Sequence, residues 1–117
     1  MAYALQTSDL DTEFRGMLLE SIGETIHVLL GDEPQRVLFE RLGNDFHLKR
    51  EEIPDRLGDF QTALTALLGA GSPVLVRAII RNLCSKLGIL FVRKDDYDFE
   101  AYVADCMRRY QVRPDGE

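Results

Sequence analysis

Two adjacent carboxylates, Glu51 and Glu52, are the first residues whose types could do chemistry, as half of a metal site or of a general acid–base cluster. They lie in the charged stretch LKREEIPDRLGDF, between two apolar segments. Sequence neighbours on a helical turn point about 100° apart, so the pair cannot hold one metal ion or share one proton. Pro54 disfavours helix at Ile53 and redirects the chain. We therefore predict a solvated turn here, anchored by Leu48 and Ile53.

The other residues of catalytic type are dispersed along the chain. His27 and His47 have no carboxylate or cysteine at ligand spacing, whereas a zinc site normally shows close pairs of ligands. Cys84 and Cys106 are interpreted as small core residues. The stretch GAGSP precedes a predicted helix and could bind an anion, but it lacks the lysine and the leading strand of a phosphate-binding loop. The sequence therefore predicts no catalytic residue, no metal site and no cofactor.

One organised charge feature of the sequence is basic. Arg77 and Arg81 stand on the polar side of a predicted helix, near Lys86, and Arg93 and Lys94 follow that helix. In a chain with 14 basic and 20 acidic residues, this basic stripe indicates a docking patch for an acidic protein partner. Pairing with the chain's own surplus carboxylates is the alternative interpretation. A net charge of −6 disfavours nucleic-acid binding, although the same stripe would serve a DNA-associated regulator.

Length and composition set the class of the protein. A chain of 117 residues with a hydrophobic fraction of 45% fits a single globular domain. Two distant cysteines indicate a reducing compartment rather than a disulfide scaffold. The sequence shows no signal-peptide pattern and no uninterrupted apolar run of about 18 residues. We therefore predict a cytoplasmic protein without a membrane segment, with short disordered tails at about residues 1–7 and 112–117.

Helical periodicity runs through most of the chain and predicts an all-α fold, a compact bundle of about five helices. The segment ILFVRK is predicted to be an extended connector, because a single strand would have no partner. The predicted helices run from about Asp9 to Leu30, through GDEPQRVLFERL up to Gly43, and over about residues 58–68, 72–86 and 98–110. The predicted core positions are Leu10, Phe14, Leu18, Ile22, Ile26 and Leu29, then Val37, Leu38 and Leu42, then Phe60, Leu64, Leu67 and Leu68, then Leu75, Val76, Ile79, Ile80, Leu83, Cys84 and Leu87, and finally Phe99, Tyr102, Val103 and Met107.

The first predicted helix is apolar over a wider face than one neighbouring helix would cover. It also contains two glycines, each of which costs roughly 1 kcal/mol relative to alanine in a helix. Either these glycines are simply tolerated, or another backbone approaches them, from this chain or from a second copy. On the second interpretation we predict a homodimer. The predicted contact residues are Phe14, Gly16, Met17 and Gly23.

Several of these segments occur in a recognisable order. ESIGETIHVLL is followed by ERLGNDFHLKREEIPDRLGDFQTALTALLGAGSPVLVRAIIRNLCSKLGI, and the chain closes with DYDFEAYVADCMRRY. The shared features are an aromatic turn at Phe46, Lys-Arg-Glu-Glu-Ile-Pro at 49–54, a helix led by Phe60, a Gly-x-Gly break at 69–71 and Lys-Leu-Gly at 86–88. Over most of its length the chain resembles the archaeal signalling domain called the Nitrosopumilus output domain, of the fifth-numbered type.

The resemblance implies a small helical output or adaptor domain in signal transduction or transcriptional regulation, with no catalytic residue to carry over. Such domains often accompany receiver or other sensory modules. This chain has no room for a receiver, so the signal is expected to arrive through a separate sensory or receiver protein. We therefore expect a non-enzymatic module that acts through protein–protein contacts. The alternatives are the DNA-associated regulator and a small-ligand sensor with a pocket between the first and fourth helices, near His27 and Cys84.

Overall fold

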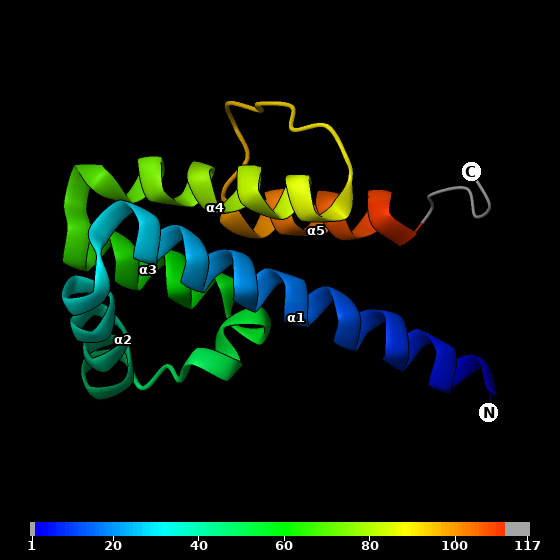
Figure 1. Cartoon of the computed structure of the whole chain (residues 1–117), viewed down its shortest axis with the longest axis horizontal. Coiled ribbons are helices and arrows are strands. Elements are labelled where there is room, and N and C mark those ends of the chain that lie inside the picture. The colour runs from blue at the N-terminus through cyan, green and yellow to red at the C-terminus, as the bar shows by residue number, and fades with distance from the viewer. Residues whose placement is uncertain (1, 112–117) are drawn as a thin grey trace.

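The computed structural model describes the backbone of residues 2–111 and the side chains of residues 12–110 (Figure 1). This part of the chain is all-α, as predicted, and contains no strand. Residues 88–98, here called the connector, join the last two α-helices without regular secondary structure. The elements are α1 (Ala2–Leu30), α2 (Asp32–Phe46), the 3-10 helix η1 (Arg50–Asp55), α3 (Leu57–Leu68), the 3-10 helix η2 (Gly69–Gly71), α4 (Ser72–Leu87) and α5 (Phe99–Gln111).

Two helix ends differ from the sequence prediction. Helix α1 begins at Ala2 rather than near Asp9, so most of the predicted amino-terminal tail is helical, whereas residues 112–117 lie outside the described part. Helix α2 continues through Gly43, which was predicted to end it, and stops where His47 adopts φ 53° and ψ 41°. Phe46 packs against the core, so tertiary contact outweighs the low helix propensity of glycine in this last turn.

Helix α4 lies at the centre of the core. It packs most extensively against α1 and also against α3 and α5. In Figure 1, α4 runs alongside the carboxyl-terminal half of α1. Within the core, the rings of Phe60 in α3 and Phe99 in α5 lie 5.6 Å apart. Both predicted apolar rows of α4 are confirmed as buried. The buried residues of these rows are Leu75, Val76, Ile79, Ile80, Leu83, Cys84 and Leu87.

Two predicted core positions are exposed instead. The exposed fraction is 50% for Leu29 and 39% for Val37, and the side chain of Leu10 lies outside the described residues. The turn at Gly31, where φ is 95°, places Leu30 rather than Leu29 beside α2. The periodic stripe therefore ends one turn earlier than the helix does.

One helical stretch of the described residues, Leu57–Leu87, is long and apolar enough by composition to cross a membrane, with a hydropathy of 1.7 in its 18-residue window. The stretch is the succession α3, η2 and α4, and the chain reverses direction at η2 (Figure 1). Gly69 supports this reversal with a φ of 57°. Of the residues in the apolar window, 39% are buried inside the fold. The apolar composition of the stretch is one that core helices share with membrane helices.

The central position of α4 predicts the effect of truncating its side chains. Ile79 is fully buried, so Ile79→Ala is expected to lower the free energy of unfolding by about 2–5 kcal/mol, measured by urea denaturation. Val74 belongs to the same helix but is 57% exposed, so Val74→Ala serves as the matched control and is expected to change stability by less than about 0.5 kcal/mol. Equal losses in the two variants would contradict the central role of α4.

Candidate functional site

The connector follows a fixed path although it has no regular structure. The hydroxyl of Tyr102 accepts a hydrogen bond from the backbone N–H of Lys94 and donates one to its carbonyl oxygen, both at 2.8 Å. Further along α5, Arg109 Nη1 donates to the carbonyl oxygen of Leu90 at 2.9 Å. The ring of Phe91 stacks on Tyr102 with 5.9 Å between centroids. Helix α5 therefore holds the connector at both its apolar and its basic part.

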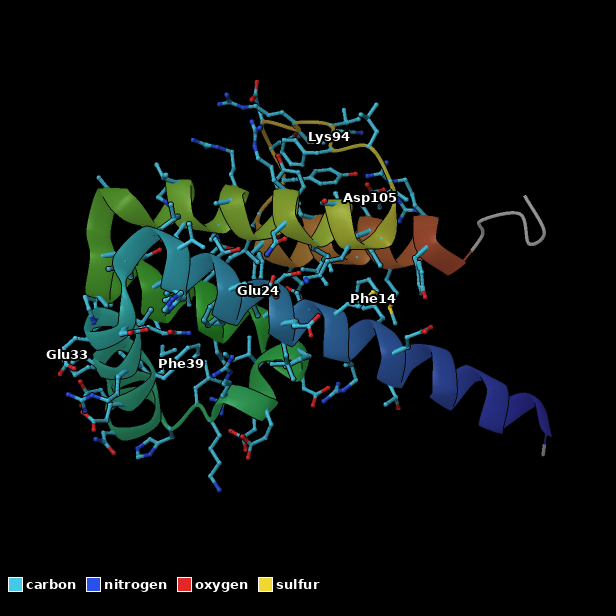
Figure 2. All side chains as sticks on the ribbon, in the orientation of Figure 1. Phe14, Glu24, Glu33, Phe39, Lys94 and Asp105 are labelled. Atoms are coloured by element: carbon cyan, nitrogen blue, oxygen red, sulfur yellow. The ribbon has the colours of Figure 1, made fainter. Side chains whose placement is uncertain are left out.

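Four residues of the predicted basic stripe come together at this connector. The guanidinium of Arg81 lies 4.9 Å above the ring of Phe91, and Arg77, Arg93 and Lys94 line one cavity of about 170 Å³. Figure 2 shows Lys94 on the connector, which stands off the exposed side of α4. Helix α4 contributes no carboxylate to this side, because it contains neither aspartate nor glutamate.

The fifth predicted residue, Lys86, has a different environment. Its Nζ lies 3.0 Å from a carboxylate oxygen of Glu24 and 3.3 Å from one of Glu20, both on α1. Hydrogen bonds from Lys86 and from Asn82 lower the pKa of Glu24, and the hydrogen bond to Glu24 raises the pKa of Lys86. Lys86 therefore belongs to the contact between α1 and α4, as the internal-pairing alternative predicts.

The other cations of the stripe are only partly paired. Arg93 Nε lies 3.2 Å from Asp95 Oδ1. Among the described side chains, no carboxylate pairs with Arg77, Arg81 or Lys94. Internal pairing therefore explains Lys86 and Arg93 but not these three.

Two apolar side chains extend the same surface. Leu90 is 76% exposed and Val92 is 46% exposed, on either side of the half-buried Phe91. Exposed leucine and valine next to stacked cations form a mixed apolar and basic area, which is the composition of many protein contact sites. We call this area the docking surface and define it by Arg77, Arg81, Leu90, Val92, Arg93 and Lys94.

The acidic pair Glu51 and Glu52 forms a turn and not a site. Glu52 Oε1 accepts a hydrogen bond from the backbone N–H of Lys49 at 3.0 Å and so caps η1, while Glu51 is exposed. Leu48 and Ile53 are buried, as predicted for the anchors of the turn. No group of three or more histidine, cysteine, aspartate or glutamate side chains within the described residues could hold a metal ion.

His27 and Cys84 lie in different surroundings, and a cavity of about 340 Å³ beside His27 is lined by residues of α1, α2 and η1. His27 is exposed, and its Nδ1 lies 2.9 Å from Asp32 Oδ1 at the turn between α1 and α2. Cys84 is buried on the other side of α4, against Cys106 of α5. The ligand-sensor alternative stays a prediction, and Cys84 does not line the cavity beside His27.

The four predicted dimer-contact residues do not share one free face. Phe14 is only 3% exposed, and Gly23 is buried under Arg50 and Gln35 of the same chain, with Gln35 Nε2 donating to the Gly23 carbonyl oxygen at 2.9 Å. Met17 is half-buried against the core, and Gly16 is exposed. The space above Gly23 is thus filled by side chains of α2 and η1 rather than by the predicted backbone, and it needs no second copy. The homodimer itself stays a prediction.

The sequence analysis missed one pair of chemically competent residues. The Sγ atoms of Cys84 and Cys106 lie 3.7 Å apart in the core, between α4 and α5. Their hydrogen bond lowers the pKa of Cys84 and raises that of Cys106, and the nearby charge of Arg109 lowers the pKa of both thiols. Helical periodicity placed both cysteines on inward faces, but a separation of 22 residues along the chain gave no sign that they meet.

Comparison with protein-family models, with curated proteins and with solved structures found no match to this chain. The assignment of a function therefore depends on the geometry of the docking surface and on the resemblance in the sequence.

We expect the two glycines of α1 to respond differently to substitution by alanine. A Cβ at Gly16 would meet no atom within 4 Å, so Gly16→Ala is expected to stabilise the fold by up to about 1 kcal/mol. A Cβ at Gly23 would collide with the Arg50 guanidinium, which lies 4.7 Å from the centre of the Phe39 ring. Gly23→Ala is therefore expected to gain less than Gly16→Ala, or to destabilise.

The Arg50→Ala background is the control for this comparison. Removing the obstructing side chain should restore to Gly23→Ala most of the gain seen for Gly16→Ala, in urea unfolding of the single and double variants. A Gly23→Ala gain that is the same with and without Arg50 would show that another group limits the space there.

Proposed function

We propose that this protein is a non-enzymatic helical interaction module that binds an acidic segment of another protein through the docking surface. The observation that carries the proposal is the group of three cations without a carboxylate partner among the described side chains, Arg77, Arg81 and Lys94, beside the exposed Leu90 and Val92. These cations stand out in a chain of net charge −6. The acidic remainder repels an acidic partner, whereas this surface offers it an attractive approach.

The chemistry of the surface favours carboxylates that are accompanied by apolar side chains. Arginine donors recognise carboxylates in a bidentate manner, and stacking of Arg81 on Phe91 holds its plane while its edge stays available for hydrogen bonds. Burial of Leu90 and Val92 under the partner would add a hydrophobic contribution to the binding free energy. Salt screens the attraction between exposed charges, so the charges alone would bind less strongly. The cavity beside Arg77 and Lys94 is also lined by Asp95 and Asp98, so an acidic side chain of the partner would bind at the cations on its rim rather than inside it.

The resemblance to an output domain suggests the setting of this interaction. We propose signal transduction or transcriptional regulation in the cytoplasm, with a separate sensory or receiver protein as the partner. Such a partner would bring the signal to this chain. DNA binding through the same cations is the competing function, and the acidic net charge speaks against it.

The proposal predicts selective binding of acidic, apolar peptides. The probe is a fluorescent synthetic peptide of alternating glutamate and leucine, compared with its lysine–leucine counterpart by fluorescence anisotropy. Arg77→Glu combined with Arg81→Glu is expected to weaken binding of the acidic peptide at least about tenfold, because each reversal replaces attraction by repulsion. Leu90→Ser with Val92→Ser is expected to weaken it without changing its salt dependence.

Charge reversal elsewhere provides the matched control for this experiment. Arg36 and Arg41 on α2 are exposed but already paired, with Glu33, Glu40 and Asp45, so Arg36→Glu with Arg41→Glu should leave peptide binding unchanged. Equal affinity for the two peptides would contradict the docking surface. Tighter binding to duplex DNA than to the acidic peptide would establish the competing function instead.

The homodimer is a separate part of the proposal, tested by light scattering over a concentration series. Gly16 is the one predicted contact residue that is exposed, so we expect a mass of two chains that Gly16→Arg reduces towards one. Ala70→Arg, at an exposed position of η2, is the control and should leave the mass unchanged. A single-chain mass at all concentrations would remove self-association from the proposal.

A further inference from the structure

The two cysteines of the chain lie next to each other in the core, between α4 and α5. Cys84 and Cys106 are 2% and 1% exposed, and their sulfur atoms lie 3.7 Å apart. A disulfide requires about 2.05 Å between the sulfur atoms, so the two sulfur atoms must move closer for the bond to form. The chain contains no other cysteine, so no competing intramolecular pairing exists.

Arg109 gives this pair an electropositive neighbour. Its Nη1 donates a hydrogen bond to the connector at the carbonyl oxygen of Leu90. Its Nε is buried and has no hydrogen bond within the described residues. This Nε lies 3.3 Å from Asp105 Oδ2, with which it forms an ion pair. The hydrogen bond with Cys106 is the main cause that lowers the pKa of Cys84, and the guanidinium charge lowers it further, whereas burial and Asp105 raise it. The pKa of Cys106 is raised, so Cys84 is the thiol that supplies the reactive thiolate. Arg109 thus links the thiols to the connector, which carries four of the six residues of the docking surface.

We propose that Cys84 and Cys106 form a redox-sensitive dithiol, which a hydroperoxide converts into a disulfide between α4 and α5. The Cys84 thiolate attacks a peroxide oxygen, so that an S–O bond forms, the O–O bond breaks, and an alcohol or water leaves with the Cys84 proton. The Cys106 sulfur then attacks the sulfenic sulfur of Cys84, forming the S–S bond while the S–O bond breaks and water leaves with the Cys106 proton. Two thiols are oxidised and one hydroperoxide is reduced.

The disulfide would close a loop that contains the whole connector, because residues 88–98 lie between the two cysteines. Closing this loop restricts α5 and the connector, and it lowers the entropy of the unfolded chain. Where the docking surface acts as proposed above, the restricted connector binds an acidic peptide several-fold more tightly, since less freedom is lost on binding. This last consequence rests on the proposed function, whereas disulfide formation does not.

The test is titration of the reduced full-length protein with hydrogen peroxide, followed by intact-mass measurement and thiol alkylation. One equivalent is expected to remove the mass of two hydrogen atoms and both free thiols, and to raise Tm by about 5–15 °C, with all three changes reversed by dithiothreitol. Cys106→Ser should instead retain a sulfenic acid at Cys84 that dimedone traps. Thiols that stay reduced until methionine is oxidised, or disulfides formed mainly between chains, would overturn the proposal.

The role of Arg109 has its own matched variants. Arg109→Leu is expected to slow disulfide formation about tenfold, because the thiolate loses its neighbouring cation, and Arg109→Lys is expected to keep most of the rate. Arg108→Leu, an exposed neighbour that also pairs with Asp105, should leave the rate unchanged. Equal rates in all three variants would show that Arg109 does not act on the thiols.

The peptide-binding experiment separates this proposal from the proposed function. Disulfide formation, Tm and the alkylation of thiols are measured without any partner. Normal oxidation without peptide binding would remove the docking function and leave the dithiol intact. Peptide binding in a protein whose thiols resist peroxide would overturn the dithiol alone.

Discussion

Burial of two adjacent rows of α4 side chains is the constraint on which the rest of the structure depends. One row contains Leu75, Ile79 and Leu83, and the other contains Val76 and Ile80, so α4 must be covered over a wide arc. Helices α1, α3 and α5 all contact it and cover this arc together. Only a narrow side of α4 remains for polar residues. The place of the docking surface therefore follows from the way in which the core is closed.

The path of the connector is the second consequence of this arrangement. After Gly88 turns the chain with a φ of 72°, the connector must travel to the start of α5, which packs beside α4. Without a neighbouring strand, its backbone groups need other hydrogen-bond partners. Tyr102 and Arg109 of α5 provide them at Lys94 and Leu90. A segment held from one side in this way leaves its other side exposed, which explains why apolar residues lie there uncovered.

Periodicity in the sequence was sufficient for the helices and for most of the core, because one inward face of a helix needs only local spacing. It failed at Leu29 and Val37, where the angle between α1 and α2 decides which residue is covered. It also could not show that Arg50 fills the space above Gly23, or that Cys84 meets Cys106. Such contacts join residues on different elements, so they depend on crossing angles that no local pattern contains. The basic stripe was visible from spacing, whereas its division into the paired Lys86 and Arg93 and the unpaired Arg77, Arg81 and Lys94 was not.

The difference between α2 and α4 shows why the unpaired cations point to a partner. In α2, Arg36 and Arg41 each have a carboxylate three or four residues away, so local pairing satisfies them. In α4 no position carries an acid, and Arg77 and Arg81 face each other at a spacing that repels by a few tenths of a kcal/mol. Lys86 is balanced by α1, whereas Asp95 and Asp98 line the same cavity as Arg77 without forming an ion pair with it. A carboxylate from another molecule would relieve this repulsion, and the exposed side of α4 is where it can approach.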